Sequence, residues 1–269
     1  MKIGRQGASR SAISAANADV ILVRGMDLCR ELIGQISFTD HVWLLVAGRL
    51  PTDAQRHILD ATLVAIAEHG LVPSVVAGRM TLAAAPEALQ GAVAAGLLGC
   101  GSVILGAAES AARLCADIVK RAAGGSIGEA ARLILTELRD ARRPIPGYGH
   151  PLHKAADPRA QQLLAVAQQN QINGLHIEAA RAIEKWIPQI VGKPLAMNVS
   201  AAIGALLLDA GYPLLAVKGV PLLARTASLV AHLLEEQQHP IGFALADSGS
   251  ASIEYDGPRP PGFVPAEGN

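Results

Sequence analysis

Apolar residues recur at helical spacing along most of the chain. Ile58, Leu59, Leu63 and Ile66 lie on one face of a predicted helix over residues 53–69, bounded by Thr52 and Gly70. The same criteria predict a short helix over residues 27–34 and longer helices over residues 38–46, 86–98, 104–123, 126–142, 158–170, 175–187, 198–210 and 212–236. With about ten helices and no hairpin signal, the pattern predicts an all-α fold.

The two ends of the chain break this pattern. Residues 1–20 are polar, and we expect an arm with little regular structure. Residues 20–23 form a short apolar run that suits either a strand or the lead into a helix. From Gly242 onward the chain is rich in Gly, Ser and Pro, and we expect it to wrap over a surface.

Composition narrows the class of protein. Hydrophobic residues make up 51% of the chain and charged residues 17%, with 23 basic and 23 acidic side chains. So much apolar mass excludes disorder for most of the chain, and zero net charge gives no general attraction to nucleic acid. The low charge also indicates that much of the surface is buried in another subunit.

Two further features of the sequence bear on whether the protein enters a membrane and on its compartment in the cell. The longest stretch without charge, residues 88–108, is long enough to span a bilayer, but its five glycines with Gln90 and Ser102 favour a buried core helix. We therefore expect no membrane partner. The first twenty residues lack the apolar run of a signal peptide, so the expected compartment is the cytoplasm.

The cysteines and histidines predict neither a disulfide framework nor a metal site. The three cysteines have no paired spacing, and Cys100 and Cys115 stand in apolar context as expected core thiols. His150 and His153 are spaced like a metal pair, but no third ligand stands at a typical spacing, because Asp157 is better placed as a helix cap.

The sharpest change in composition falls at residues 144–159, where two Gly and four Pro among sixteen residues predict a loop. Its glycines let a ligand approach the backbone, and His150 can transfer a proton near neutral pH. Lys154 and Arg159 suit a phosphate or carboxylate. This combination favours an anionic ligand beside a proton transfer; the alternative is a Pro-rich turn before a solvated basic helix.

Three residues outside the loop are also candidates. His69 closes the predicted helix over residues 53–69, where the helix C-terminus would stabilise a cationic ring without any ligand. Arg225 and His232 stand seven apart and share one face of a helix, which suits a carboxylate. The alternative for Arg225 is a buried ion pair with Glu235 or Glu236.

The loop sequence PGYGHPLHKAADPRA resembles the glycine-tyrosine-glycine-histidine to aspartate-proline-arginine loop of the citrate synthase superfamily. The segments VRGMDLCRELIGQISFTDHVWLLVAGRLPT, AEHGLVPS, GLLGCGSVILGAAESA, NVSAAIGALLLDAG and ARTASLVAHLLEEQ follow in family order. The resemblance covers residues 20–257. The chain is similar to the stand-alone citryl-CoA lyases and to the corresponding module of ATP citrate lyase.

This resemblance implies a short form of the two-domain helical citrate synthase fold, assembled as a homodimer or higher oligomer. Residues 1–106 with 211–269 would form the large, dimerising domain, and residues 107–210 the small domain that carries His150. The substrates would be a coenzyme A thioester and a carboxylate-bearing partner such as oxaloacetate, with no tightly bound cofactor and no metal.

Residue roles follow by the same resemblance. His150 would exchange a proton with the oxygen that is carbonyl in oxaloacetate and hydroxyl in citryl-CoA, and the catalytic set would be His150, His69 and Ser200. The residues implied to hold carboxylates are His69, Arg159 and Arg225, and His232 is added to them because it shares the helix face of Arg225. The residues implied to contact coenzyme A are Pro146, Gly147, Tyr148, Gly149 and Lys154.

The departures from the family pattern bear on the reaction. The family's enolate-stabilising histidine falls at or near Ile104, and citryl-CoA lyase modules also lack it, which favours a lyase. The family's catalytic aspartate falls at Ser200, and a serine without a partner base cannot deprotonate a thioester methyl group. A family arginine near the C-terminus falls at Ser250, with Arg259 offset, which indicates fewer substrate carboxylates or a rearranged site.

The sequence therefore favours a carbon–carbon lyase acting on a citryl-CoA-type thioester. One alternative is condensation of acetyl-CoA with a 2-oxo acid, as in citrate synthase. Another is a CoA-binding, regulatory homologue that has lost its chemistry with the aspartate. A structural subunit without a ligand does not explain the basic, glycine-rich loop.

Overall fold

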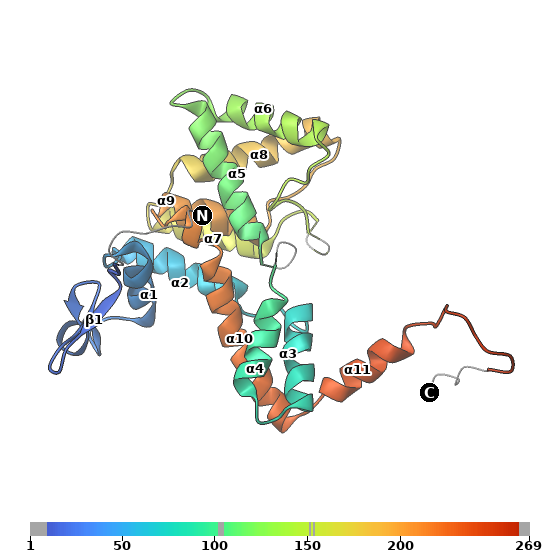
Figure 1. The fold of residues 1–269 in the computed structure, drawn as a ribbon. Coiled ribbons are helices and arrows are strands. Elements are labelled where there is room, and N and C mark those ends of the chain that lie inside the picture. Colours follow the sequence, from blue (N-terminus) through green and yellow to red (C-terminus); the bar gives the residue numbers. More distant parts are fainter. Residues whose placement is uncertain (1–9, 102–104, 151, 153, 264–269) are drawn as a thin grey trace, which may run out of the picture. The chain divides into compact units, whose positions relative to one another are not determined.

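The computed structural model describes residues 10–101, 105–150, 152 and 154–263 (Figure 1). Internal packing divides the chain into two compact units, Met1–Ala65 with Ala107–Val220 and Ile66–Gly106 with Pro221–Asn269. The predicted division into residues 1–106 with 211–269 and residues 107–210 has the same boundary after residue 106. The two divisions differ in where they place residues 1–65 and 211–220, and the predicted domains stay a prediction.

The first unit is built around α9 (Val199–Asp209), whose residues are almost all buried. It packs against α5 (Ala107–Ala122), α7 (Pro158–Gln169) and α8 (Leu175–Val191), as Figure 1 shows. α6 (Ile127–Asp140) lies on α5 and α8, and the Ser126 side chain caps it as predicted. A helix with no polar side is stable only when neighbours cover it on all sides, so α9 is the core of this unit.

The N-terminal part of the first unit contains a small antiparallel sheet of β1 (Ser14–Ala16), β2 (Ile21–Val23) and β3 (Met26–Asp27). The all-α class is confirmed, but the expectation that the chain contains no hairpin was wrong here. Arg24 and Gly25 form the two-residue turn between β2 and β3, with φ values of 51° and 85°. Two positive φ values match the right-handed strand twist, and Arg-Gly is a weaker sequence signal for that turn than Asn-Gly.

The remaining helices of this part follow the predictions closely. Asp27 caps the short π-helix η1 (Leu28–Leu32), and Ser37 and Asp40 form a reciprocal capping box at α1 (Phe38–Ala47). α2 (Asp53–Ala67) begins after Thr52, as expected. The predicted helix over residues 212–236 is divided into η2 (Leu214–Ala216) and α10 (Gly219–Gln238).

The second unit contains α3 (Pro73–Ala84), α4 (Leu89–Leu98), α11 (Gly242–Ala251) and most of α10. α3 was not predicted, and the helix expected from residue 86 begins at Leu89. Gly78 and Gly96 bring α3 and α4 close to α10: an added Cβ would lie 3.3 Å and 2.7 Å, respectively, from Leu229 Cδ2. Glycines that weaken a helix in isolation are here required by tertiary packing.

The segment expected only to wrap over a surface forms a helix, α11. Its start is fixed by Glu236, whose carboxylate accepts the backbone N–H groups of Ile241 and Gly242. Gly242 lies so close to α3 that an added Cβ would be 2.5 Å from Ala83 Cβ. The helix is therefore set by long-range contacts that its Gly- and Ser-rich sequence does not reveal.

The apolar stretch of residues 88–108 is not one continuous helix, because α4 ends at Leu98. Within the described part of the chain, one helical run, Leu214–Gln238, has the length and apolar composition of a membrane span, with 39% of it buried inside the protein. Core helices of soluble proteins meet the same criterion. Cys100 and Cys115 are buried free thiols, as predicted.

Candidate active site

The loop that carries His150 is tied to the start of α9 by backbone hydrogen bonds. The Gly149 N–H donates to Ala196 O at 2.8 Å, and the Asn198 N–H donates to Gly147 O at 2.9 Å. Gly147 has a φ of +89°, and an added Cβ would lie 2.6 Å from Ala201 Cβ. Only glycine fits this position, because both the backbone angle and the distance to α9 exclude a side chain.

Tyr148 anchors the same loop to the interior. Its side chain is buried, its hydroxyl donates to Ala180 O in α8 at 2.7 Å, and its backbone pairs with Met197. Burial raises the pKa of the Tyr148 phenol well above its ordinary value. Tyr148 therefore acts here as a structural anchor, and its phenol faces the protein.

Asn198 links the loop to the helix end. Its side-chain amide donates to Gly149 O at 2.9 Å, while its side-chain oxygen accepts the Ser200 N–H at 3.0 Å and caps α9. Ser200 lies in the first turn of α9 and is half-buried. Asn198 thus links Ser200, which occupies the position of the family aspartate, to the backbone of Gly149, next to His150.

Asp157 joins α7 to α9. It is 1% exposed, caps α7 as predicted, and accepts the Arg159 side chain at 2.9 Å and the Val199 N–H at 3.0 Å. Burial alone would raise the pKa of Asp157, but the hydrogen bonds from Arg159 and from the Val199 backbone outweigh it and hold the pKa below its usual value. The guanidinium of Arg159 is thereby fixed beside the loop.

His150 has a different neighbour at each ring nitrogen. The Leu152 N–H donates to Nδ1 at 3.1 Å, and Arg159 Nη2 lies 3.4 Å from Nε2. A neutral imidazole has one acceptor nitrogen, so these contacts favour two alternative tautomers. One tautomer presents an acceptor at Nε2 and the other presents a donor, which suits a group that moves a proton in either direction.

The remaining loop residues are accessible to different degrees. Lys154 is exposed, Pro146 is half-buried and Gly147 is buried. His153, the partner in the rejected metal pair, and Ile104 lie outside the described residues. Among the residues that the structure describes, no group of three metal-ligating side chains comes together.

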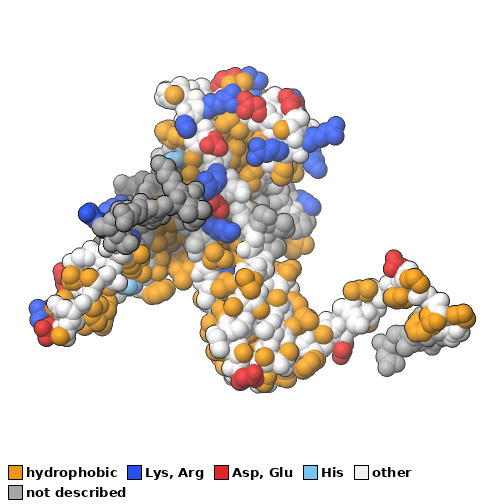
Figure 2. Space-filling view, in the orientation of Figure 1, with side chains coloured by type: hydrophobic (Ala, Val, Ile, Leu, Met, Phe, Trp, Pro, Cys, Tyr) orange, Lys and Arg blue, Asp and Glu red, His pale blue; other side chains and the backbone are white. Residues whose placement is uncertain are grey.

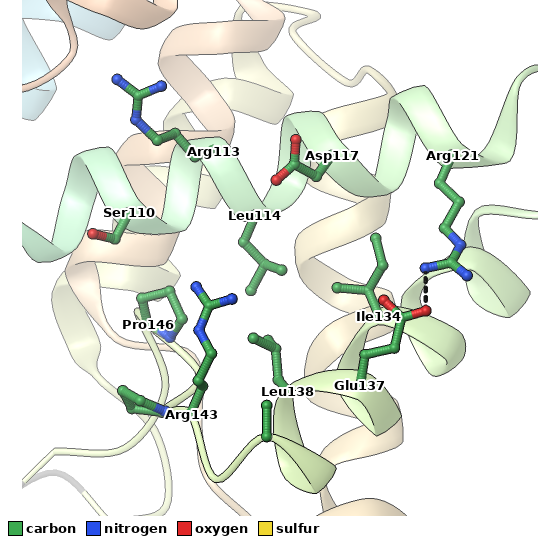
Figure 3. A pocket seen from close by; sticks show the side chains of 12 residues that line it. Ser110, Arg113, Leu114, Asp117, Arg121, Ile134, Glu137, Leu138, Arg143 and Pro146 are labelled. Atoms are coloured by element: carbon green, nitrogen blue, oxygen red, sulfur yellow. Dashed lines mark hydrogen bonds and ion pairs between the residues drawn. The ribbon is translucent and has the colours of Figure 1, made fainter.

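A cavity of about 780 Å³ adjoins the loop on the side of α5 and α6. Figure 3 shows Leu114, Ile134 and Leu138 along its walls, with Arg143 pointing in between the two helices and Arg121 paired to Glu137. Its lining residues are Ser110, Arg113, Leu114, Asp117, Arg121, Ile134, Glu137, Leu138, Ala141, Arg143, Pro144 and Pro146. The volume is in the range of small-molecule sites, and the walls combine apolar and charged groups.

The second unit holds the other candidates. His69 is exposed in the turn beyond α2, which ends at Ala67, and is therefore not part of the helix end itself. His232 Nε2 lies 3.0 Å from the carboxylate of Glu68, which also accepts the Ser228 hydroxyl at 2.6 Å. Sequence analysis missed Glu68, whose only signal was its position next to His69.

Arg225 is 2% exposed, and its Nε and Nη1 have no hydrogen-bond partner among the described residues. The alternative that pairs it with Glu235 or Glu236 is wrong, because both carboxylates bind Arg79. An unpaired buried guanidinium is costly, and a ligand carboxylate would remove that cost.

The sequence-predicted residues are divided between the two compact units. His150, Arg159, Ser200, Lys154 and the Pro146–Gly149 segment belong to the first unit, while His69, Arg225 and His232 belong to the second. Asn198 was not predicted as a site residue, although its place before the helix over residues 199–209 marks it as a cap.

Comparison with known proteins shows the family and the fold of this chain. The family model for the citrate synthase C-terminal domain matches residues 53–242. The fold superimposes on citryl-CoA lyase from Hydrogenobacter thermophilus with a TM-score of 0.84 and 31% identity, covering 96% of this chain and 97% of that one. ATP citrate lyase from Methanothrix soehngenii, solved with citrate and coenzyme A, gives a TM-score of 0.76 at 22% identity over 96% of this chain and 43% of that one.

A curated relative in sequence is the putative citrate synthase 2 of Mycobacterium tuberculosis H37Rv, 28% identical over 215 residues. The match covers 76% of this chain and 53% of that protein, so the chain spans about half the length of the curated relatives it matches. The helical fold and the loop resemblance are thereby confirmed. The chain belongs to the citrate synthase family.

Proposed function

We propose that the protein cleaves a citryl-CoA-type thioester into an acyl-CoA, such as acetyl-CoA, and a 2-oxo acid, such as oxaloacetate. The observation that carries this proposal is the position of His150, with a hydrogen-bonding neighbour at each nitrogen and with Nε2 beside Arg159. The citryl-CoA lyase match, which extends over nearly the full length of both chains, supports the choice of reaction.

Cleavage begins when His150 accepts the substrate hydroxyl proton at Nε2. The oxygen becomes a carbonyl, the adjacent carbon–carbon bond breaks, and its electron pair moves into the thioester as an enolate. The Ser200 hydroxyl donates a hydrogen bond to that enolate, and water supplies the proton that completes the acyl-CoA. Because water, and not a side-chain carboxylate, exchanges the methyl proton in this scheme, a serine at position 200 is compatible with cleavage.

The basic residues would bind different carboxylate groups. Arg159, fixed by Asp157, would hold a carboxylate beside His150. Arg225, with two nitrogens that have no hydrogen-bond partner in the described part of the chain, would bind another carboxylate, assisted by His69 and His232.

We propose further that the nucleotide end of coenzyme A binds in the cavity between α5 and α6. Leu114, Ile134, Leu138 and Pro146 offer apolar contacts to a base, and Arg143 offers a cation to a phosphate. Coenzyme A and pantetheine should then differ in affinity, and Arg143→Ala should weaken coenzyme A binding while leaving pantetheine unaffected.

A second candidate is a CoA-binding protein without turnover, and Ser200 favours it, since the family's catalytic carboxylate is missing there. The two proposals differ in what Ser200→Asp does. In a silent regulatory protein this substitution restores an ancestral group and produces activity. A lyase is already active before the substitution.

We also propose a homodimer formed through the second unit. α3 and α4 together carry one charged side chain, Arg79, which is buried, whereas Leu89 and Leu98 are exposed. Hydrophobic side chains gather on this part of the surface (Figure 2). An apolar surface of this kind is typical of a subunit interface. Light scattering should give twice the chain mass of 27.8 kDa, and a single-chain mass would contradict the proposal.

The experiment that tests the main proposal measures CoA release and 2-oxo acid formation from citryl-CoA and, in parallel, from citramalyl-CoA. We expect oxaloacetate or pyruvate above background, and loss of turnover in His150→Ala. His57→Ala, an exposed histidine of the same unit, is the matched control and should retain turnover. Coenzyme A binding without product would support the regulatory candidate, and turnover in His150→Ala would exclude the mechanism.

A further inference from the structure

The carboxylate of Glu68 gathers three hydrogen-bond donors. The Gly70 N–H donates to it at 2.5 Å, the Ser228 hydroxyl at 2.6 Å and the His232 ring nitrogen Nε2 lies at 3.0 Å. The first donor belongs to the turn that follows α2, and the other two belong to α10. One side chain therefore connects the turn that carries His69 to a helix that is distant in sequence.

The partners on α10 lie on the same face as Arg225. Ser228 follows Arg225 by three residues and His232 follows Ser228 by four, which is the spacing of one helical stripe. Glu68 contacts the second and third members of this stripe. Its hydrogen bonds do not include the nitrogens Nε and Nη1 of Arg225, which keep no partner in the described residues.

The contact with Glu68 determines which ring nitrogen of neutral His232 carries the proton. Burial by itself raises the pKa of Glu68, but the hydrogen bonds from Ser228, from the Gly70 backbone and from His232 outweigh it, and the pKa is lowered. Glu68 is therefore ionised near neutral pH, and an ionised carboxylate only accepts hydrogen bonds. The ring proton of neutral His232 must then be on Nε2, which leaves Nδ1 for a ligand.

We infer that Glu68 is a positioning residue of the substrate site: it sets the tautomer and orientation of His232 and holds the turn that carries His69. This inference rests on the proposed role of His232 and His69 in binding the substrate. Because Ser228 and His232 occupy the carboxylate, the cation of Arg225 is left for the substrate. Glu68 itself does not need to touch the substrate.

Glu68→Gln is the sharpest test. The Gly70 N–H donates to Oε1 of Glu68, while Ser228 and His232 share Oε2. With its amide oxygen kept on the Gly70 N–H, the glutamine places its NH₂ group at the position of Oε2, where it donates to the Ser228 hydroxyl and favours the tautomer of His232 with its proton on Nδ1. We expect ¹⁵N NMR of the free protein to show the Nε2-protonated ring in the natural protein and a shift toward Nδ1 protonation in Glu68→Gln. We expect KM for the thioester to rise about 10- to 100-fold, which is the usual effect of removing a residue that orients a binding-site side chain. We expect a smaller change in kcat.

Three variants separate positioning from stability. Glu87→Gln, an exposed glutamate of the same unit, should leave the NMR signals and KM unchanged. Ser228→Ala keeps the contact between Glu68 and His232 and should preserve the tautomer. If Glu68→Gln does not fold, Glu68→Asp is measured in its place. This variant keeps the charge on a shorter side chain and should retain the Nε2-protonated ring.

An unchanged tautomer in folded Glu68→Gln would overturn the inference, and so would an unchanged KM despite a changed tautomer. Because the NMR measurement uses the free protein, it gives its answer even if citryl-CoA is not a substrate. In that case the same variants are compared by calorimetry with citrate, and equal affinity in Glu68→Gln and Glu87→Gln would overturn it.

Discussion

The backbone N–H of Val199 donates to the carboxylate of Asp157 at 3.0 Å, which joins the start of α9 to the start of α7. The same carboxylate fixes the guanidinium of Arg159. Through this one buried group, the helix that carries Ser200 and the arginine beside His150 share a common support. A change at Asp157 should therefore affect both stability and the site.

We predict that Asp157→Asn destabilises the protein by about 3 kcal/mol, because it removes one partner of a buried ion pair. The pKa of Asp157 is lowered in the folded protein from its usual 3.8. Its contribution is thus complete above about pH 4 and is lost as the pH falls through the folded-state pKa. Chemical denaturation at several pH values should show a constant difference between the two proteins above pH 5 that shrinks in acid.

The loop glycine Gly147 allows a controlled substitution. Gly147→Ala would place a Cβ 2.6 Å from Ala201 Cβ at a φ of +89°, whereas Gly124→Ala meets the same backbone strain, at a φ of +86°, in open space. We expect Gly124→Ala to cost about 1 kcal/mol and Gly147→Ala clearly more, with loss of turnover. Equal unfolding free energies would show that the loop can move away from α9.

Arg225 and Arg79 are equally buried but differ in their partners. Arg79→Met should destabilise the protein by about 3–5 kcal/mol, because it strands the carboxylate of Glu236. Arg225→Met should leave stability unchanged or raise it by about 1 kcal/mol, because it removes a charge without an ion-pair partner in the described residues. Thermal unfolding with and without citrate tests both: the stabilisation by citrate should disappear in Arg225→Met.

A destabilised Arg225→Met protein without ligand would contradict this reasoning, because it would mean that the guanidinium has partners in solution. Retained stabilisation by citrate would contradict the assigned role in carboxylate binding. The two outcomes are independent, since one concerns the free protein and the other concerns its complex.

Two helical glycines should respond to alanine with opposite signs. An added Cβ at Gly204 would lie 2.8 Å from the backbone N of Ala112, while Gly249 in α11 has nothing within 4 Å. We expect Gly204→Ala to cost about 1–3 kcal/mol through forced separation of α5 and α9. Gly249→Ala should gain roughly 0.5–1 kcal/mol from higher helix propensity, and denaturant melts of both variants check the signs.

The sequence by itself determined the mainly helical class, most helix positions and the loop that carries His150, because these depend on local signals. Helical periodicity, the caps at Ser126 and Asp157, and the density of Gly and Pro at residues 144–159 are readable within one or two turns. The family loop also identified His150 and Arg159 as candidates, and the segment ARTASLVAHLLEEQ identified Arg225.

Only the tertiary structure decided the features that depend on residues far apart in the chain. α11 owes its start to Glu236, and α3 contains a glycine that a propensity argument penalises but α10 requires. Glu235 and Glu236 pair with Arg79, and Nε and Nη1 of the buried Arg225 have no hydrogen-bond partner among the described residues. The carboxylate of Glu68 forms hydrogen bonds with side chains 160 and 164 residues away in the sequence. These contacts form only when the chain packs into its tertiary structure, so no local pattern in the sequence predicts them.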